Sequence, residues 1–179
     1  MTKYLIITLI ISFTMQTDPT LIYNFHKESS LKNWQIVNDG VMGGLSKSNL
    51  EVTENGHGKF SGQVSLANNG GFASVRLQTD VEVDNNNQEL ILKIKGDGKT
   101  YQCRVKSNKY QRESYVHEFE TTGQWQEIKL KLKDFEPQFR GRQLNKPNFD
   151  FSSIQEFSLL IANKKEEDFT LLIDSISLK

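Results

Sequence analysis

The sequence has only one cysteine and no excess of either charge. Cys103 has no second cysteine to pair with, so no disulfide can form within the chain. The 22 lysines and arginines balance the 22 aspartates and glutamates. Proteins that bind nucleic acid usually carry a basic excess that neutralises phosphates, so this balance argues against a nucleic-acid partner. Cys103 alternates with Tyr101 and Val105, which indicates a small buried residue of the core rather than a nucleophile.

Motifs of catalysis and of cofactor binding are also missing. The Gly-Lys-Thr at 98–100 resembles the end of a phosphate-binding loop, but Lys93 stands where that loop needs its first glycine. No Gly-x-Ser-x-Gly elbow of a hydrolase occurs. No second histidine or cysteine lies at metal-ligand spacing from any of the three histidines, which are His26, His57 and His117. We therefore expect a protein that is not an enzyme and has no cofactor and no metal, although the sequence leaves a glycosidase-type pair of carboxylates open.

Long apolar runs are absent except at the N-terminus. Lys3 precedes an apolar run from Tyr4 to Phe13, which is too short to span a bilayer as a helix of about 20 residues. A positive residue before about 7–15 apolar residues is typical of a secretory signal peptide. We expect residues 1–17 to form such a signal, with no transmembrane span and with export to the periplasm or the extracellular space. A buried first strand in a cytoplasmic protein is the alternative.

Long apolar repeats of helical period are missing too, and short alternating runs take their place. Clusters of Gly, Asn and Asp separate these runs, which is the pattern of an all-β protein. The runs cover residues 21–25, 45–52, 58–66, 72–79, 90–95, 100–106, 115–120, 125–132, 154–161 and 169–178. Apolar faces of this kind are buried by packing two sheets together. We therefore predict one all-β domain over residues 20–179, a jelly-roll β-sandwich of two antiparallel sheets with about eight to ten strands.

The alternation within the runs also predicts the core and the few helical turns. Turns of helix are expected near 134–139 and 151–154. The residues expected between the two sheets are Phe60, Val75, Leu92, Tyr101, Leu130, Leu159 and Ile173.

Two glycine-rich segments stand apart from the strands. The first runs from Trp34 to Ser46, and the second leads from Phe60 to Arg76. They combine glycines with an acid, a methionine and an arginine. Loops of this composition either make tight turns or line a binding site, and the residues alone leave both interpretations open.

These two segments resemble the signature of the complex I intermediate-associated protein 30 family. That signature is an Asp-x-Val-Met-Gly-Gly-x-Ser loop, then Phe-x-Gly, then Gly-Gly-Phe-x-Ser-x-Arg. Further likeness at 96–101, 125, 135–141 and 169–176 extends the resemblance from about Leu21 to the C-terminus. It implies a galactose-binding-domain-like jelly roll. It also implies a non-catalytic, chaperone-like assembly factor that engages a protein partner, as family members do for respiratory complex I. The matching residues are Asp39, Val41, Met42, Gly43, Gly44, Ser46, Phe60, Gly62, Gly70, Gly71, Phe72, Ser74 and Arg76.

The resemblance places the binding or loop-organising residues in the two loops and at one further arginine. These residues are Asp39, Met42, Gly43, Gly44, Ser46, Gly70, Gly71, Phe72, Ser74, Arg76 and Arg140. Export does not suit the assembly of a mitochondrial-type complex, so the fold can carry over without the partner. The alternative is a carbohydrate- or small-ligand-binding module of the cell envelope, with aromatic contacts from Trp34, Phe72 and Tyr110. A concave polar surface around Arg76 favours a ligand, and a flat apolar surface favours a protein.

One contact between the two loops can be predicted. Arg76 alternates away from Val75 and Leu77, so it does not share their core face. An arginine placed against an apolar layer needs a carboxylate or carbonyl partner. We predict that Asp39 and Arg76 lie close together in a charge-assisted hydrogen bond. This bond either pins the loop to the sheet or helps to line a binding surface.

Overall fold

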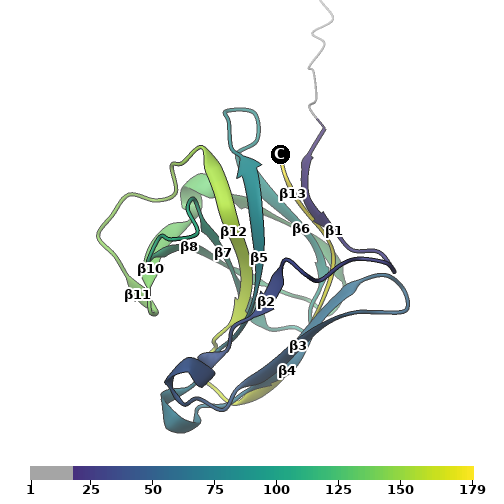
Figure 1. Cartoon of the computed structure of the whole chain (residues 1–179), viewed down its shortest axis with the longest axis vertical. Helices are drawn as coiled ribbons and strands as arrows, with labels where there is room; N and C mark the ends of the chain where they lie inside the picture. The colour runs from purple at the N-terminus through teal and green to yellow at the C-terminus, as the bar shows by residue number, and fades with distance from the viewer. Residues whose placement is uncertain (1–17) are drawn as a thin grey trace, which may run out of the picture.

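A computed structural model describes residues 18–179, and its thirteen strands form two antiparallel sheets that pack face to face (Figure 1). The predicted signal peptide, residues 1–17, lies outside the described residues. Sheet A has the order β3 (Lys47–Val52), β4 (Gly58–Val64), β13 (Glu167–Leu178), β6 (Glu89–Lys95) and β9 (Trp125–Lys131), with β1 (Thr20–Asn24) beside β13. Sheet B has the order β11 (Arg142–Gln143), β10 (Glu136–Phe139), β8 (Ser114–Glu120), β7 (Thr100–Lys106), β12 (Ser153–Ile161), β5 (Ala73–Glu82) and β2 (Trp34–Ile36). This architecture is the predicted all-β jelly-roll sandwich, but it has thirteen strands where about eight to ten were predicted.

The longest strand, β13, holds sheet A together. Its first half pairs with β4, from Glu167 opposite Val64 to Ile173 opposite Gly58. Its last residues pair with β1, where Thr20 lies opposite Leu178. The first described strand therefore lies beside the end of the chain (Figure 1).

Apolar side chains on the two inner faces form one continuous core. Cys103 and Leu159 face each other across β7 and β12, and Val75 lies opposite Leu159 on β5. Cys103 is fully buried, as its place in the alternating row predicts. All seven residues predicted to lie between the sheets are buried, namely Phe60, Val75, Leu92, Tyr101, Leu130, Leu159 and Ile173.

The predicted helical turn at 134–139 is wrong, because most of this segment is strand β10. Phe135 and Pro137 are buried while Glu136 is exposed, which is the two-residue period of a strand. Pairing of β10 with β8 fixes this period. The predicted turn at 151–154 is also wrong, since β12 begins at Ser153. The helical turns of the described residues are three 3₁₀ segments, η1 (Asp39–Met42), η2 (Ala67–Asn69) and η3 (Leu132–Asp134). Within residues 18–179, no helix has the length and apolar character needed to cross a bilayer.

Candidate functional site

The first glycine-rich loop is organised around the carboxylate of Asp39, which is buried at the start of η1. The backbone N–H groups of Ser46 and Gly71 donate hydrogen bonds to it over 3.1 and 2.7 Å. The Ser46 hydroxyl donates a further bond of 2.5 Å, and the Phe72 N–H donates one of 3.3 Å. Burial alone raises the pKa of Asp39, but the bonds from Ser46, Gly71 and Phe72 outweigh it and hold this pKa below its ordinary value. Asp39 thus joins the two signature segments.

Two glycines make room for this carboxylate. A Cβ atom on Gly44 would lie 2.3 Å from the Asp39 Cγ, and one on Gly70 would lie 2.6 Å from its Oδ2. Gly43 ends η1 with a φ of +86°, which side chains rarely adopt. Close packing around Asp39 therefore explains Gly44 and Gly70, and the left-handed backbone explains Gly43.

Neighbouring polar side chains attach this loop to the edge of sheet B. The Ser74 hydroxyl donates to the Val37 carbonyl, and the Val37 N–H donates to the Ser74 carbonyl over 2.9 Å. The Asn38 Oδ1 accepts a bond of 2.8 Å from the Ser48 hydroxyl. These contacts hold the loop between β2, β3 and β5.

The predicted bond between Asp39 and Arg76 is wrong. The Asp39 oxygens are taken by Ser46, Gly71 and Phe72. No ion pair or side-chain hydrogen bond among residues 18–179 involves Arg76, which lies half-buried on β5. Backbone N–H groups satisfy the buried carboxylate instead of a cation.

Arg76 belongs to a different feature, the outer face of sheet B, which faces away from sheet A. Its central residues lie on β12, between β5 and β7, and alternate with the core residues. Five residues of this outer face are nevertheless more than nine-tenths buried, so the middle of the face lies below the side chains around it, and we call this part of the face the recess. They are Ser74, Val116, Glu156, Ser158 and Leu160.

Two arginines lie in the middle row of this recess. Arg76 on β5 and Arg104 on β7 both pair with Ser158 on β12. Side chains paired in this way point to the same face of the sheet. The recess therefore carries two positive charges on either side of a buried hydroxyl group.

An open hollow of about 750 Å³ lies at one end of the same face. Gln78 on β5, two residues beyond Arg76, is at its border, and Tyr110 in the β7–β8 loop is 81% exposed. The residues around the hollow are Asn33, Gln78, Thr79, Asp80, Asn108, Lys109, Tyr110 and Gln155. Amide groups and an exposed aromatic ring are thus gathered at this end of the recess.

The other aromatic and arginine candidates lie elsewhere. Trp34 pairs with Leu77 and packs edge-on against Tyr23, with ring centres 5.2 Å apart, so it belongs to the border of the core. Arg140 follows β10 at the opposite edge of sheet B from β2, and its guanidinium lies 5.4 Å from the ring centre of Phe139. The structure brings Asp39, Gly44, Ser46, Gly70, Gly71 and Phe72 together but leaves Arg140 apart.

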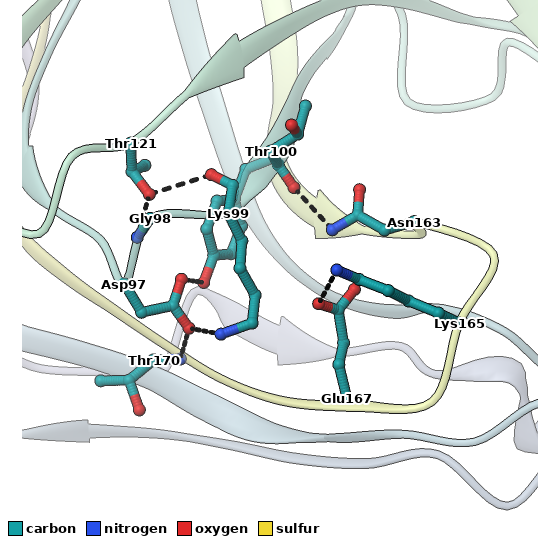
Figure 2. Close-up of polar contacts among 10 residues, drawn as sticks. Asp97, Gly98, Lys99, Thr100, Thr121, Asn163, Lys165, Glu167 and Thr170 are labelled. Carbon is teal, nitrogen blue, oxygen red and sulfur yellow. Dashed lines mark hydrogen bonds and ion pairs between the residues drawn. The ribbon is translucent and has the colours of Figure 1, made fainter.

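The family-like segment around Asp97 forms a second polar cluster (Figure 2). The Asp97 carboxylate accepts bonds from Lys99 Nζ at 2.7 Å, from the Tyr101 hydroxyl at 2.9 Å and from the Thr170 N–H at 2.9 Å. Burial raises the pKa of Asp97, but these three partners together lower it below its ordinary value. This cluster fastens the β6–β7 turn to β13, and its side chains satisfy one another.

Sequence reasoning missed Arg104 and Ser158, which complete the recess around Arg76. The alternation in β7 places Gln102, Arg104 and Lys106 opposite the core, and this is a detectable signal of a polar outer face. The pairing of β7 with β12 was not detectable, because β12 lies far from β7 in the sequence.

Comparison with known proteins gives both a family and a fold. A family 11 carbohydrate-binding module from Clostridium thermocellum, in complex with a β-1,3-1,4-mixed-linked tetrasaccharide, superposes with a TM-score of 0.65 at 16% identity, over 90% of this chain and 96% of that one. The family 11 module of the cellulosomal cellulase Lic26A-Cel5E of the same organism gives a TM-score of 0.66 at 16% identity, over 90% and 94%. The agarase AgWH50C gives 0.61 at 14% identity, over 91% of this chain but 24% of the agarase.

At these identities the likeness shows the shared jelly-roll sandwich. No curated protein sequence matches this chain. The model of the Complex I intermediate-associated protein 30 family matches residues 23–173, which include both glycine-rich loops, the Asp97 segment and most of β13. By this match, the chain belongs to the complex I intermediate-associated protein 30 family.

Proposed function

We propose that this protein is a non-catalytic binding module that holds a saccharide on the outer face of sheet B. The observation that carries the proposal is the recess: outward-facing residues of β5, β8 and β12 are buried, and polar side chains surround them. Small-ligand sites are concave and carry a few well-placed polar groups. The buried polar residues beside Arg76 and the hollow that begins at Gln78 support such a site.

The hollow at the end of the recess suits a sugar ring. Tyr110 can pack its ring against the apolar face of a sugar, and the side chains of Asn33, Asn108 and Gln155 offer both donors and acceptors to hydroxyl groups. The similar fold of a carbohydrate-binding module in complex with a tetrasaccharide supports this function.

A second candidate is the chaperone-like assembly role, in which the module engages a protein. Membership in the complex I intermediate-associated protein 30 family favours it. Leu45 and Leu66, which are 56% and 42% exposed, lie within the two glycine-rich segments and offer apolar contacts. On this view the signature loops and not the recess form the binding surface.

Affinity electrophoresis and calorimetry against a panel of plant, algal and bacterial polysaccharides test the first proposal. Tyr110→Ala should weaken binding about tenfold, which corresponds to about 1.4 kcal/mol of lost contact. Trp125→Ala is the control, because Trp125 is a partly exposed aromatic residue on β9 of the other sheet. The proposal fails if no polysaccharide binds or if the two variants behave alike. Capture of a protein from an envelope extract that is lost in Leu45→Asp and kept in Tyr110→Ala would support the second candidate instead.

We also propose that the protein is exported, since an apolar segment follows Lys3. Mass spectrometry of the protein from its native source should then find a mature N-terminus between residues 15 and 20. A chain that retains Met1 in a soluble cytoplasmic fraction contradicts export.

A further inference from the structure

The outer face of sheet B holds two positive charges that no carboxylate neutralises. Arg76 and Arg104 lie on either side of Ser158 and point to the same face. No ion pair within 4 Å involves either guanidinium in the part of the chain that the structure describes, 18–179. The Ser158 hydroxyl makes no side-chain hydrogen bond among these residues either, although Ser158 is only 4% exposed.

Another cation of this face has a carboxylate partner. Lys106 lies one row away on β7, and its Nζ is 3.6 Å from a carboxylate oxygen of the buried Glu156. The Glu156 side chain also accepts a bond of 3.3 Å from the Gln78 amide. The two arginines thus differ from Lys106, which has a carboxylate partner on the same face.

The Arg104 guanidinium is held in one orientation without being neutralised. Its Nε and Nη2 donate to the Gln102 Oε1 over 3.0 and 2.6 Å. The Gln102 amide in turn donates to Glu118 over 2.9 Å, so that this carboxylate binds the amide and not the arginine. A guanidinium has five N–H donors, and two of the three nitrogens of Arg104 are engaged by Gln102. Its remaining donors are fixed in direction and open to a ligand.

Two like charges kept close together in a recess carry an electrostatic cost. Burial first, and then the charge of Arg76, lower the pKa of Arg104 to about 10, against the opposing effect of Glu118. Arg104 remains charged at neutral pH. An anion between the two guanidinium groups would remove the repulsion and use their free donors, and planar guanidinium groups bind oxyanions with paired hydrogen bonds.

We propose that Arg76, Arg104 and Ser158 form a subsite for the oxyanion of an acidic saccharide, either the carboxylate of a uronic acid or a sulfate ester. This inference rests on the proposed saccharide-binding function and names the class of saccharide. The arginine row and the hollow are connected: Gln78 on β5 is two residues from Arg76 and on the same side of the strand, about 7 Å along it. One oligosaccharide can therefore reach both.

The test compares acidic ligands with a neutral one. Binding of the full chain is measured by calorimetry with oligogalacturonate, with its fully methyl-esterified form and with a sulfated galactan. The wild type should bind at least one acidic ligand about tenfold more tightly than the neutral ester. Arg76→Gln and Arg104→Gln should each remove this preference, so that the acidic ligand and the ester bind with similar affinity. Lys129→Gln is the control, since it makes the same change in charge on the exposed side of β9 in sheet A.

The outcomes separate this inference from the function on which it rests. Loss of binding to the carboxylate in both arginine variants supports a uronate subsite, and the same loss confined to the sulfated ligand supports a sulfate subsite. Equal binding of neutral and acidic ligands, unchanged in the arginine variants, overturns the subsite and leaves saccharide binding in place. An equal effect of Lys129→Gln also overturns it, because the attraction would then be non-specific. If no saccharide binds, both proposals fail. Thermal unfolding of each variant checks that a loss of binding is not a loss of fold.

Discussion

At the scale of single residues, the Asp39 carboxylate shows how a signature motif can serve the fold. Backbone N–H groups of Ser46, Gly71 and Phe72 surround it, and no basic side chain takes part. Every residue type except proline can supply a backbone N–H donor, so a sequence does not reveal which residues do so. The sequence therefore indicated that Asp39 and the glycines are important. It led to the wrong partner, Arg76, because a basic side chain can be recognised in a sequence and a backbone N–H donor cannot.

Replacement of Gly44 by alanine tests this packing. Its Cβ would lie 2.3 Å from the Asp39 Cγ, whereas a Cβ on Gly40 would meet no atom within 4 Å. Gly44→Ala should lower the free energy of unfolding by about 1–3 kcal/mol, the usual cost of overpacking. Gly40→Ala, in the same loop, should change it by less than about 0.5 kcal/mol. Chemical denaturation measures both, and equal effects would show that the carboxylate can move away.

The lowered pKa of Asp39 predicts a pH dependence of stability. A carboxyl group with a depressed pKa in the folded state stabilises the fold above its unfolded pKa, about 3.9, and this contribution is lost as the pH falls through the folded pKa. Asp39→Asn should therefore be less stable than the wild type at pH 7, and the difference should shrink below about pH 4. Asp168→Asn, at an exposed position of β13, is the control. A gap that stays constant down to pH 2 would show that the charge of Asp39 is not what stabilises the loop.

At the scale of elements, long strands were predictable and short ones were not. Two-residue alternation located β6, β7, β9 and β12 to within about a residue at most ends. The strands β2, β10 and β11 have three, four and two residues, too few to show a period. They form because β5, β8 and β10, respectively, offer them edges to pair with. The arginine row was unpredictable for a related reason, since it depends on β12 lying between β5 and β7.

Truncation of Leu92 tests the packing of the two sheets. Leu92 on β6 is fully buried and lies opposite Ile176 on β13 and Ile128 on β9. Leu92→Ala should lower the free energy of unfolding by about 2–5 kcal/mol, because a cavity remains between the sheets. Leu21→Ala, at a residue that is 59% exposed on β1, should cost less than about 0.5 kcal/mol. A small effect at Leu92 would mean that the sandwich collapses to fill the space.

At the scale of the whole molecule, the sandwich unfolds in one cooperative step only if the two sheets unfold together. Cys103 can report on this, because it is the only cysteine in the chain. It lies on β7, an interior strand of sheet B, with its side chain fully buried towards sheet A. Burial raises the pKa of its thiol, which further suppresses the thiolate that reacts with labelling reagents.

Labelling of Cys103 by a disulfide reagent should therefore follow global unfolding. The native protein should react slowly, and the rate should rise with denaturant in parallel with the unfolding equilibrium. Leu92 lies in the opposite sheet, on a strand that pairs with β13 and β9 and not with β7. Leu92→Ala therefore leaves the strands beside Cys103 unchanged. If Cys103 becomes accessible only by global unfolding, this variant should be labelled on the order of 30-fold faster or more. The reason is that a loss of about 2 kcal/mol in the free energy of unfolding raises the fraction of unfolded molecules by that factor. Fast labelling in the wild type that Leu92→Ala leaves unchanged would instead show that sheet B opens locally at β7, while sheet A stays folded.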